Sequence, residues 1–216
     1  MSGPALVSGP ARNRVTPFGT IVTAPGRGAW MGNRGRLHEG SGSRDIVRDH
    51  RGTAWLICAL SFRDRRVPQW HPNRYTPLFF LDEAVAFAAG HRPCAECRHC
   101  AFTAFGDAWA AAHGGGRRYA PEMDAVLHAE RRHDRKGRRI LIAMPWADLP
   151  DGVFVMDGED PAVVARDQLT RFDAGSNAYG EHCPRPRSGA AAVITPPSTV
   201  AVLRAGYPVQ IADEAR

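Results

Sequence analysis

The sequence contains no apolar run that approaches the ~20 residues needed to cross a lipid bilayer. Residues 1–14 are rich in Gly, Pro and Ala and lack the apolar core of a signal peptide, so we expect them to form a flexible tail. Hydrophobic residues make up 44% and charged residues 23% of the chain, which excludes a disordered or fibrous protein. The 216 residues therefore predict a globular cytoplasmic protein with no membrane partner.

Lysine is almost absent from the chain. Lys136 is its one lysine, and the other 27 basic residues are arginines. The 28 basic residues exceed the 22 acidic residues, which gives a net charge of +6. Arginine is the side chain best shaped for bidentate contacts with phosphate. The charge favours DNA as a partner, bound through phosphate contacts, and a solvated basic surface is the alternative.

Motifs of nucleotide-binding and serine enzymes are also missing. No P-loop or dinucleotide-binding G-x-G-x-x-G follows an expected strand, and no Ser nucleophile elbow is present. The cysteines number five, and Cys94, Cys97 and Cys100 fall within seven residues. This odd number and close spacing favour metal binding over disulfides.

The order of strand-like and helix-like patterns predicts an α+β fold. The expected elements are strands over 18–24, 53–62 and 78–81, a short helix between the N-cap Asp82 and Gly90, and helices over 97–113 and 121–132. From about Ile140 onward the chain changes to short strands and turns, with strands expected over 152–156, 162–165 and 191–194. We therefore expect three regions: the tail 1–14, a small zinc-stabilised module with a helical extension at 15–140, and a small β-rich C-terminal domain at 141–216.

Cys94-Ala-Glu-Cys97 is the strongest chemical signal in the chain. Two thiolates at C-x-x-C spacing can occupy two corners of a zinc tetrahedron when the chain turns into a helix between them. The free N–H groups at the helix start stabilise the anionic sulfurs. A redox C-x-x-C motif normally follows a strand, whereas this one follows a helix, Gly90 and a turn. The spacing predicts a structural Zn²⁺.

Two further zinc ligands must come from elsewhere in the chain. We expect Cys58, in the expected strand over 53–62, to be the third ligand. The alternative is a buried core residue, since free cysteines are typical of protein cores. His38, Cys100 and His71 compete for the fourth position in that order, because His38 ends a segment expected to pair with the Cys58 strand. The expected metal ligands are therefore His38, Cys58, Cys94 and Cys97.

Residues 78–98, LFFLDEAVAFAAGHRPCAECR, resemble the second half of the Ada-type zinc-binding module. An aromatic strand, an Ala-rich helix ending in Ala-Gly and an Arg-Pro-Cys-x-x-Cys-Arg knuckle follow in the same order, within a similarity over about 54–100. The resemblance implies that two upstream ligands join the knuckle cysteines around zinc and that basic residues contact DNA phosphates. The family's upstream Cys-x-x-x-Cys pair is absent, so a histidine such as His38 would replace one thiolate, and methyl transfer to Cys58 is not expected.

A competing interpretation is an enzyme. His128-Ala-Glu130 and Pro93-Cys94-Ala-Glu-Cys97 match the H-x-E and P-C-x-x-C elements of zinc nucleobase deaminases. In those enzymes the metal activates water and the glutamate transfers protons. There H-x-E comes first, at the start of a helix, whereas here it comes second, near a helix end. A zinc-dependent hydrolase or deaminase using His128 and Glu130 remains the alternative.

Several arginines are candidates for phosphate contact. They flank the knuckle or belong to the basic run at 131–139, and they are Arg74, Arg92, Arg98, Arg131, Arg132 and Arg135. The sequence thus predicts a zinc-binding, DNA-associated protein, with a role in DNA repair or processing. A protein-interaction module with structural zinc is a further alternative.

Overall fold

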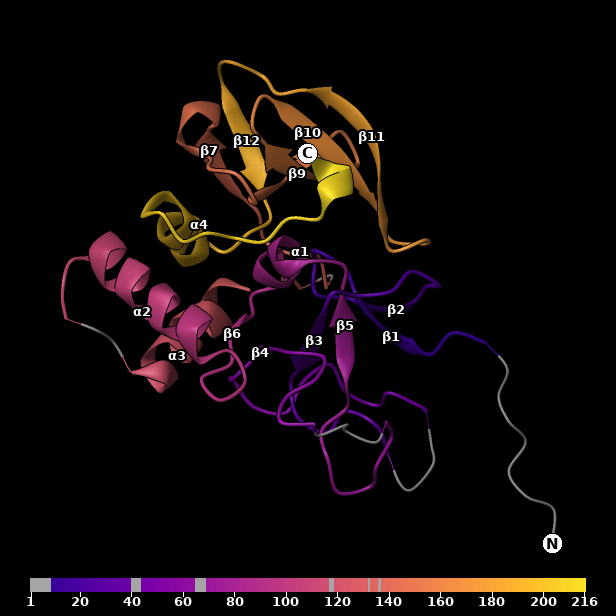
Figure 1. The fold of residues 1–216 in the computed structure, drawn as a ribbon. Coiled ribbons are helices and arrows are strands. Elements are labelled where there is room, and N and C mark those ends of the chain that lie inside the picture. Colours follow the sequence, from indigo (N-terminus) through magenta and orange to yellow (C-terminus); the bar gives the residue numbers. More distant parts are fainter. Residues whose placement is uncertain (1–8, 40–43, 65–68, 117–118, 132, 136) are drawn as a thin grey trace, which may run out of the picture.

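Two six-stranded sheets and four α-helices make up the part of the chain that the computed structural model describes, residues 9–39, 44–64, 69–116, 119–131, 133–135 and 137–216 (Figure 1). The fold is α+β, as the sequence predicts. The second sheet makes the C-terminal part β-rich.

The first sheet is built from six short strands, β1 (Arg12–Val15), β2 (Ile21–Thr23), β3 (Trp30–Asn33), β4 (Leu56–Cys58), β5 (Leu78–Phe80) and β6 (Arg92–Pro93). Their order is β2-β1-β5-β3-β4-β6. β3 pairs antiparallel with β4 and β5, whereas β6 pairs parallel with β4. Gly32 in β3 permits close packing, because a Cβ there would lie 2.6 Å from the Phe80 ring.

β1 corrects the expected extent of the N-terminal tail. Residues 12–14 belong to this strand, which pairs antiparallel with β2 and parallel with β5. Asn13 and Val15 are buried by this pairing, and a flexible segment could not supply such contacts. Residues 1–8 lie outside the described part of the chain.

α1 (Glu83–Ala88) follows β5 and begins and ends as predicted. The Asp82 carboxylate accepts the Val85 N–H at 2.8 Å, which satisfies one of the free donors of the first turn. Gly90 has φ of +84°, a left-handed conformation that glycine adopts without strain, and so it can turn the chain into β6.

α2 (His99–His113) and α3 (Ala120–Glu130) lie beside the β6 edge of the first sheet, within two residues of their predicted bounds (Figure 1). Phe105 and Trp109 form the buried side of α2, as their helical spacing predicts. Among the described residues, no helix has both the length and the apolar character to traverse a bilayer.

The second sheet is antiparallel throughout and has the order β11-β10-β9-β8-β12-β7. Its strands are β7 (Ile142–Pro145), β8 (Phe154–Asp157), β9 (Asp160–Ala165), β10 (Gln168–Asp173), β11 (Ala178–Pro184) and β12 (Ala190–Val193). The sequence patterns predicted β8, β9 and β12. They missed β7, β10 and β11, because β7 and β11 are largely exposed and β10 carries polar residues between its apolar ones.

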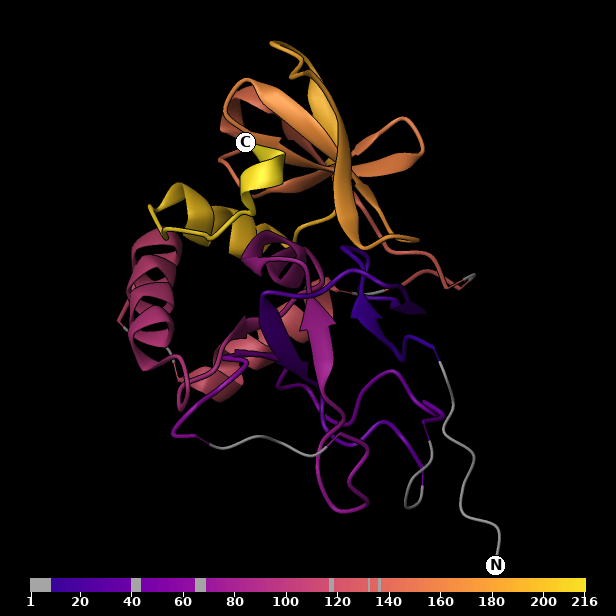
Figure 2. The ribbon, with the colours of Figure 1, turned by 45° about the vertical axis from the view of Figure 1, so that its right-hand side comes forward.

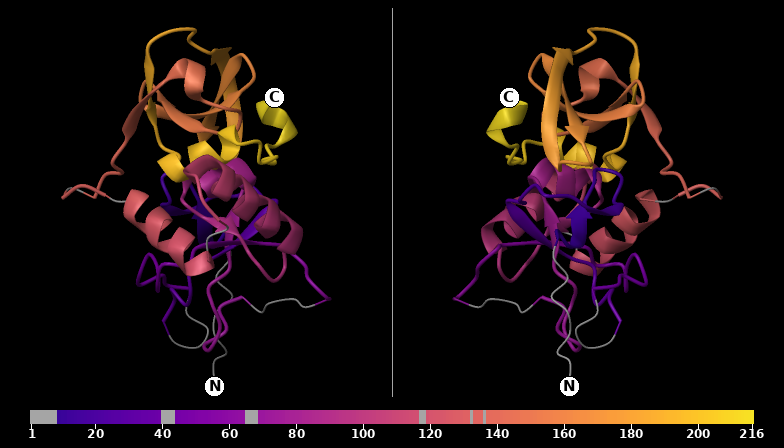
Figure 3. Two further views of the ribbon diagram at one scale, coloured as in Figure 1. Left: turned by 90° about the vertical axis from the view of Figure 1, so that its left-hand side faces the viewer. Right: turned by 90° about the vertical axis from the view of Figure 1, so that its right-hand side faces the viewer.

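One continuous core joins the two sheets. α4 (Pro197–Arg204) packs against α2 and α3, and α1 packs against β8, so a layer of helices lies between the sheets (Figures 2 and 3). A single cluster of buried apolar side chains includes residues of both sheets and of all four helices. The change of character near residue 141 therefore marks a new sheet without a break in the core.

Candidate metal centre

The end of β4 and the turn after β6 bring three cysteines together. The parallel pairing of these strands lets the Cys94 N–H donate to the Ile57 carbonyl at 2.9 Å, beside Cys58 at the end of β4. The turn then returns Cys97, whose Sγ accepts the Ala59 N–H at 3.4 Å. The Sγ atoms of Cys58, Cys94 and Cys97 all lie within 4.8 Å of one another.

The three thiols differ in acidity. Cys58 and Cys94 are 6% and 9% exposed, and Cys97 is half-buried. A hydrogen bond from the Cys58 thiol lowers the pKa of Cys94 to about 5 against the opposing effect of burial, and the backbone N–H groups of Cys97 and Glu96 add to it. That bond and burial raise the pKa of Cys58, and burial raises the pKa of Cys97. Cys94 is therefore the most acidic of the three thiols, and metal binding would release the protons that the group still holds.

The sulfur positions fit a thiophilic ion. Tetrahedral Zn–S bonds of about 2.3 Å place sulfur atoms about 3.8 Å apart, and the separations here are at most 4.8 Å. Soft thiolate ligands select zinc, Cu(I) or iron–sulfur chemistry over Mg²⁺ or Ca²⁺. The group Cys58, Cys94 and Cys97 could therefore hold one such ion.

Apolar and aromatic side chains surround the cysteines. Met31, Leu56, Phe79 and Tyr75 pack against them. Burial first, and then the negative charge of the cysteines, raises the pKa of Tyr75 to about 12, so its phenol stays protonated at neutral pH. Sequence reasoning missed Tyr75, because this residue is distant from the cysteines in the sequence and only the tertiary structure brings it to the site.

His38 is not a member of the metal group, which corrects the expected fourth ligand. Its Nδ1 lies 2.6 Å from the Thr76 hydroxyl and its Nε2 lies 3.1 Å from the His71 carbonyl, so both ring nitrogens have other partners. The His71 Nδ1 accepts the Asn73 N–H, and Cys100 is exposed on α2. Among the described residues, no His, Cys, Asp or Glu adds a fourth ligand atom to the three sulfurs.

The deaminase-like arrangement is contradicted by the structure. His128 lies outside the metal group, with its Nδ1 3.2 Å from Arg131 Nη2 and its ring 5.4 Å from that of His50. Glu130 accepts hydrogen bonds from the Ser198 N–H at 3.1 Å and from the Ser198 hydroxyl at 2.6 Å. Its carboxylate therefore satisfies donors in the first turn of α4. Neither side chain can assist water on an ion held by the cysteines.

Three of the arginines expected to face phosphate are instead turned inward. Arg92 donates to both Asp124 oxygens at 2.8 Å, and its side chain is buried. Arg98 pairs with Glu83 at 2.7 Å, also in the interior. Arg131 donates to backbone carbonyls and is 4% exposed. Asp124 and Glu83 pair with the guanidinium groups of Arg92 and Arg98, so these two are not available to a surface phosphate, whereas Arg131 forms no ion pair among the described residues.

The other three arginines fall into two groups. Arg74 and Arg135 are exposed, as phosphate contact requires. Arg132 lies outside the described residues.

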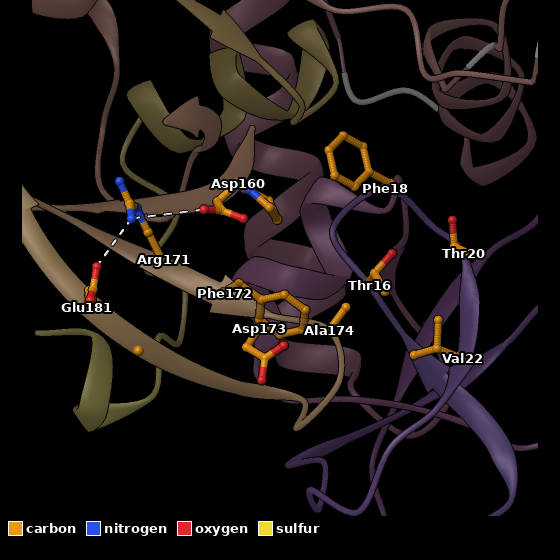
Figure 4. Close-up of a pocket in the computed structure, with 12 residues that line it drawn as sticks. Thr16, Phe18, Thr20, Val22, Asp160, Arg171, Phe172, Asp173, Ala174 and Glu181 are labelled. Atoms are coloured by element: carbon orange, nitrogen blue, oxygen red, sulfur yellow. Dashed lines mark hydrogen bonds and ion pairs between the residues drawn. The ribbon is translucent and has the colours of Figure 1, made fainter. Parts of the chain in front are cut away.

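A cleft of about 620 Å³ lies between the β1–β2 edge and β9–β11 (Figure 4). Phe18 lies on one wall, and Arg171 on the other forms ion pairs with Asp157, Asp160 and Glu181 at 2.8, 4.0 and 3.2 Å. Three carboxylates thus surround the one arginine of the described lining, which contains no histidine or cysteine. The chemistry of this cleft does not match a thiophilic metal or a phosphate.

Comparison of the chain with known protein families, curated proteins and solved structures finds no match. The three-cysteine group is therefore the feature on which a function can be proposed.

Proposed function

We propose that the chain is a zinc-binding protein that associates with nucleic acid, with the ion held by Cys58, Cys94 and Cys97. The observation that carries the proposal is the convergence of three sulfur atoms, from a strand and from a separate turn, within 4.8 Å. Core cysteines without a ligand have no need to meet in this way, whereas thiolate ligands must.

The proposed role of zinc is mainly structural. The ion would tie the end of β4 to the turn that leads into α2, and the chain between these elements contains β5 and α1. Three thiolates leave one position of a tetrahedral ion for a ligand such as water. The similarity of residues 78–98 to Ada-type modules supports the choice of zinc.

Metal analysis of the purified chain tests this proposal. We expect one zinc per chain by mass spectrometry, and its loss in Cys94→Ser because that variant removes the most acidic of the three thiols. Cys100→Ser is the matched control, since Cys100 lies one helical turn beyond Cys97 and is exposed. His38→Ala and His128→Ala should also keep the metal.

Two outcomes would contradict the assignment. Absence of any thiophilic metal from the wild-type chain, even after reconstitution with zinc under reducing conditions, would remove the proposed function. Loss of zinc in His128→Ala with retention in Cys94→Ser would move the ion to a different site.

Nucleic-acid association is supported by exposed arginines near the cysteines. Residues 59–64 follow directly after Cys58, and Tyr75, in the described segment 69–77, packs against the site. These two segments and the segments 34–39 and 44–55 lie at the end of the first sheet that is remote from the second sheet (Figures 1 and 2). They carry exposed arginines, which are Arg44, Arg48, Arg51, Arg63 and Arg74.

Binding to a short DNA duplex at several salt concentrations tests this part. We expect affinity to fall steeply as salt rises, and Arg74→Gln to reduce the slope of log K against log[salt] by about one. Arg187→Gln is the control, because Arg187 is an exposed arginine in the C-terminal part. Binding that is absent, or equally affected by both variants, would exclude Arg74 and its loop as the contact.

A further inference from the structure

A second cavity, of about 500 Å³, lies away from the cysteines and is lined largely by cationic and imidazole groups. Trp55, which precedes β4, is part of its lining, whereas Cys58 ends the same strand. The other charged or imidazole residues of the described lining are Arg34, Arg131, Arg139, Asp49, His50, His128 and His133.

The three arginines of this cavity are buried without carboxylate partners. Arg34, Arg131 and Arg139 are 0%, 4% and 9% exposed. Within the described part of the chain, none of them forms an ion pair with an aspartate or glutamate. This differs from the buried Arg92 and the half-buried Arg98, each of which has one. An uncompensated buried charge is costly, so three around one cavity call for an anion.

The guanidinium groups are held in place by the surrounding backbone. Arg34 Nη1 donates to the Gly19 carbonyl at 2.8 Å, and Arg131 Nη1 donates to the Gly90 carbonyl at 2.7 Å. Both groups stack on Trp55, with Cζ 3.8 and 3.9 Å from the ring centroid. Their positions are therefore fixed before any ligand arrives.

Each of the three arginines also has one buried guanidinium nitrogen that could donate a hydrogen bond to a ligand. Arg34 Nη2, Arg131 Nε and Arg139 Nε have no hydrogen-bond partner among the described residues. Burial lowers the pKa of Arg34 and Arg131 to about 9. The positive charge of Arg131 adds to this effect at Arg34, and that of Arg139 adds to it at Arg131 against the opposing charge of Asp124. Nearby anionic charge would relieve this repulsion.

The charge balance indicates an anion that carries between one and two negative charges. Asp49 is the one carboxylate in the described lining, so the three arginines leave two positive charges in excess when the histidines are neutral. Glu130 offsets part of the charge of Arg139 from outside this lining, and its hydrogen bonds to the uncharged Ser198 leave its negative charge in place, so the excess lies between one and two positive charges. A phosphate monoester carries about −1.5 to −2 charges at pH 7, whereas a carboxylate or a backbone phosphodiester carries one.

We propose that this cavity binds a phosphate monoester group, carried by a small molecule or by the end of a nucleic-acid strand. Arg34 forms the buried floor and acts through its charge. Arg131 and Arg139 flank the anion, and His50 and His133 contribute from the exposed side. The cavity exceeds the volume of phosphate itself and lies in the range of small-ligand sites, so it has room for an ester substituent.

Titration of the full chain with inorganic phosphate by calorimetry is the first test. We expect one saturable site, with affinity reduced at least about tenfold in Arg139→Gln, which removes one of the buried cations. Arg138→Gln is the matched control, because Arg138 is exposed, pairs with Asp134 and does not line the cavity. The control should bind phosphate as the wild type does.

Stability without ligand separates binding from folding. Since Arg139 is an uncompensated buried charge, Arg139→Gln should unfold in the absence of phosphate at a temperature no lower than the wild type. If that variant fails to fold, His50→Gln replaces it. His50 is exposed, so its loss should weaken phosphate binding about two- to fivefold and leave the unliganded melting temperature unchanged.

Two further ligand pairs identify the source of the phosphate. Tighter binding of a nucleoside 5′-monophosphate than of the nucleoside indicates a small-molecule ester. Tighter binding of a 5′-phosphorylated oligonucleotide than of its 5′-hydroxyl counterpart indicates a strand end. The proposal is overturned if neither phosphate nor either phosphorylated probe binds saturably, or if Arg139→Gln binds as tightly as the wild type. Because the cavity contains no cysteine, metal loss in Cys94→Ser tests the zinc site separately.

Discussion

Chelation of the metal should lower the midpoint of thermal unfolding by about 8–16 °C. Zinc present at about a thousand times its Kd stabilises the folded chain by about 4.1 kcal/mol, and each kcal/mol shifts the midpoint by about 2–4 °C for a chain of this size. The reason for a large effect is topological, since the cysteine group joins the end of β4 to the start of α2. Calorimetry with and without a zinc-specific chelator measures it.

Two variants show whether this shift arises at the three cysteines. Cys94→Ser should melt at the chelated midpoint with or without added zinc, because its metal group is incomplete. Cys100→Ser should retain the full zinc response. A chelator effect of the same size in Cys94→Ser would place the stabilising ion elsewhere.

Replacement of Glu83 by alanine should destabilise the fold by about 3–5 kcal/mol, the usual consequence of removing one partner from a buried ion pair. Glu83 is 1% exposed, and its Oε1 accepts the Tyr207 hydroxyl at 2.8 Å while pairing with Arg98 at 2.7 Å. Its Oε2 accepts the Gln210 N–H at 3.1 Å. Glu83→Ala would leave the Tyr207 hydroxyl, the Arg98 guanidinium and the Gln210 N–H without their acceptor. Denaturant unfolding measures the free-energy change.

The matched controls for this prediction differ in charge and burial. Glu83→Gln keeps an oxygen for Tyr207 but loses the charge facing Arg98, so its effect should be intermediate. Glu181→Ala removes an ion pair with Arg171 in which the glutamate side chain is 83% exposed, and such pairs are worth about 0–1 kcal/mol. Equal losses in Glu83→Ala and Glu181→Ala would show that the buried network does not hold the C-terminal segment in place.

Local sequence signals predicted the segment from Asp82 to the start of α2 well. These signals are Asp82 as the N-cap of α1, Gly90 as the residue that follows its end, and the start of α2 after Cys97. All three depend on contacts within a few residues of the chain. The strand around Cys58 is shorter than the predicted 53–62, because the chain leaves the sheet after Cys58. Leu60, beyond the end of this strand, is 52% exposed.

The identity of the upstream metal ligands could not be predicted from such local signals. Cys94 and Cys97 are set by one motif, and Cys58 joins them through the parallel pairing of β4 and β6. His38 was favoured for its place in the chain, but the tertiary structure directs its ring to Thr76 and the His71 carbonyl. Sequence distance contains no information on which of several upstream side chains turns towards a knuckle.

By itself the sequence determined the α+β class, the α1 boundaries and the presence of a cysteine knuckle, because these features depend on neighbours in the chain. Only the tertiary structure decided which arginines are neutralised and which are not. Arg92 pairs with Asp124 and Arg98 with Glu83, whereas Arg34, Arg131 and Arg139 line a cavity and form no ion pair with any described carboxylate. The interaction energy of a buried charge depends on the distance to its counter-ion, and that distance is set by the packing of segments far apart in the chain.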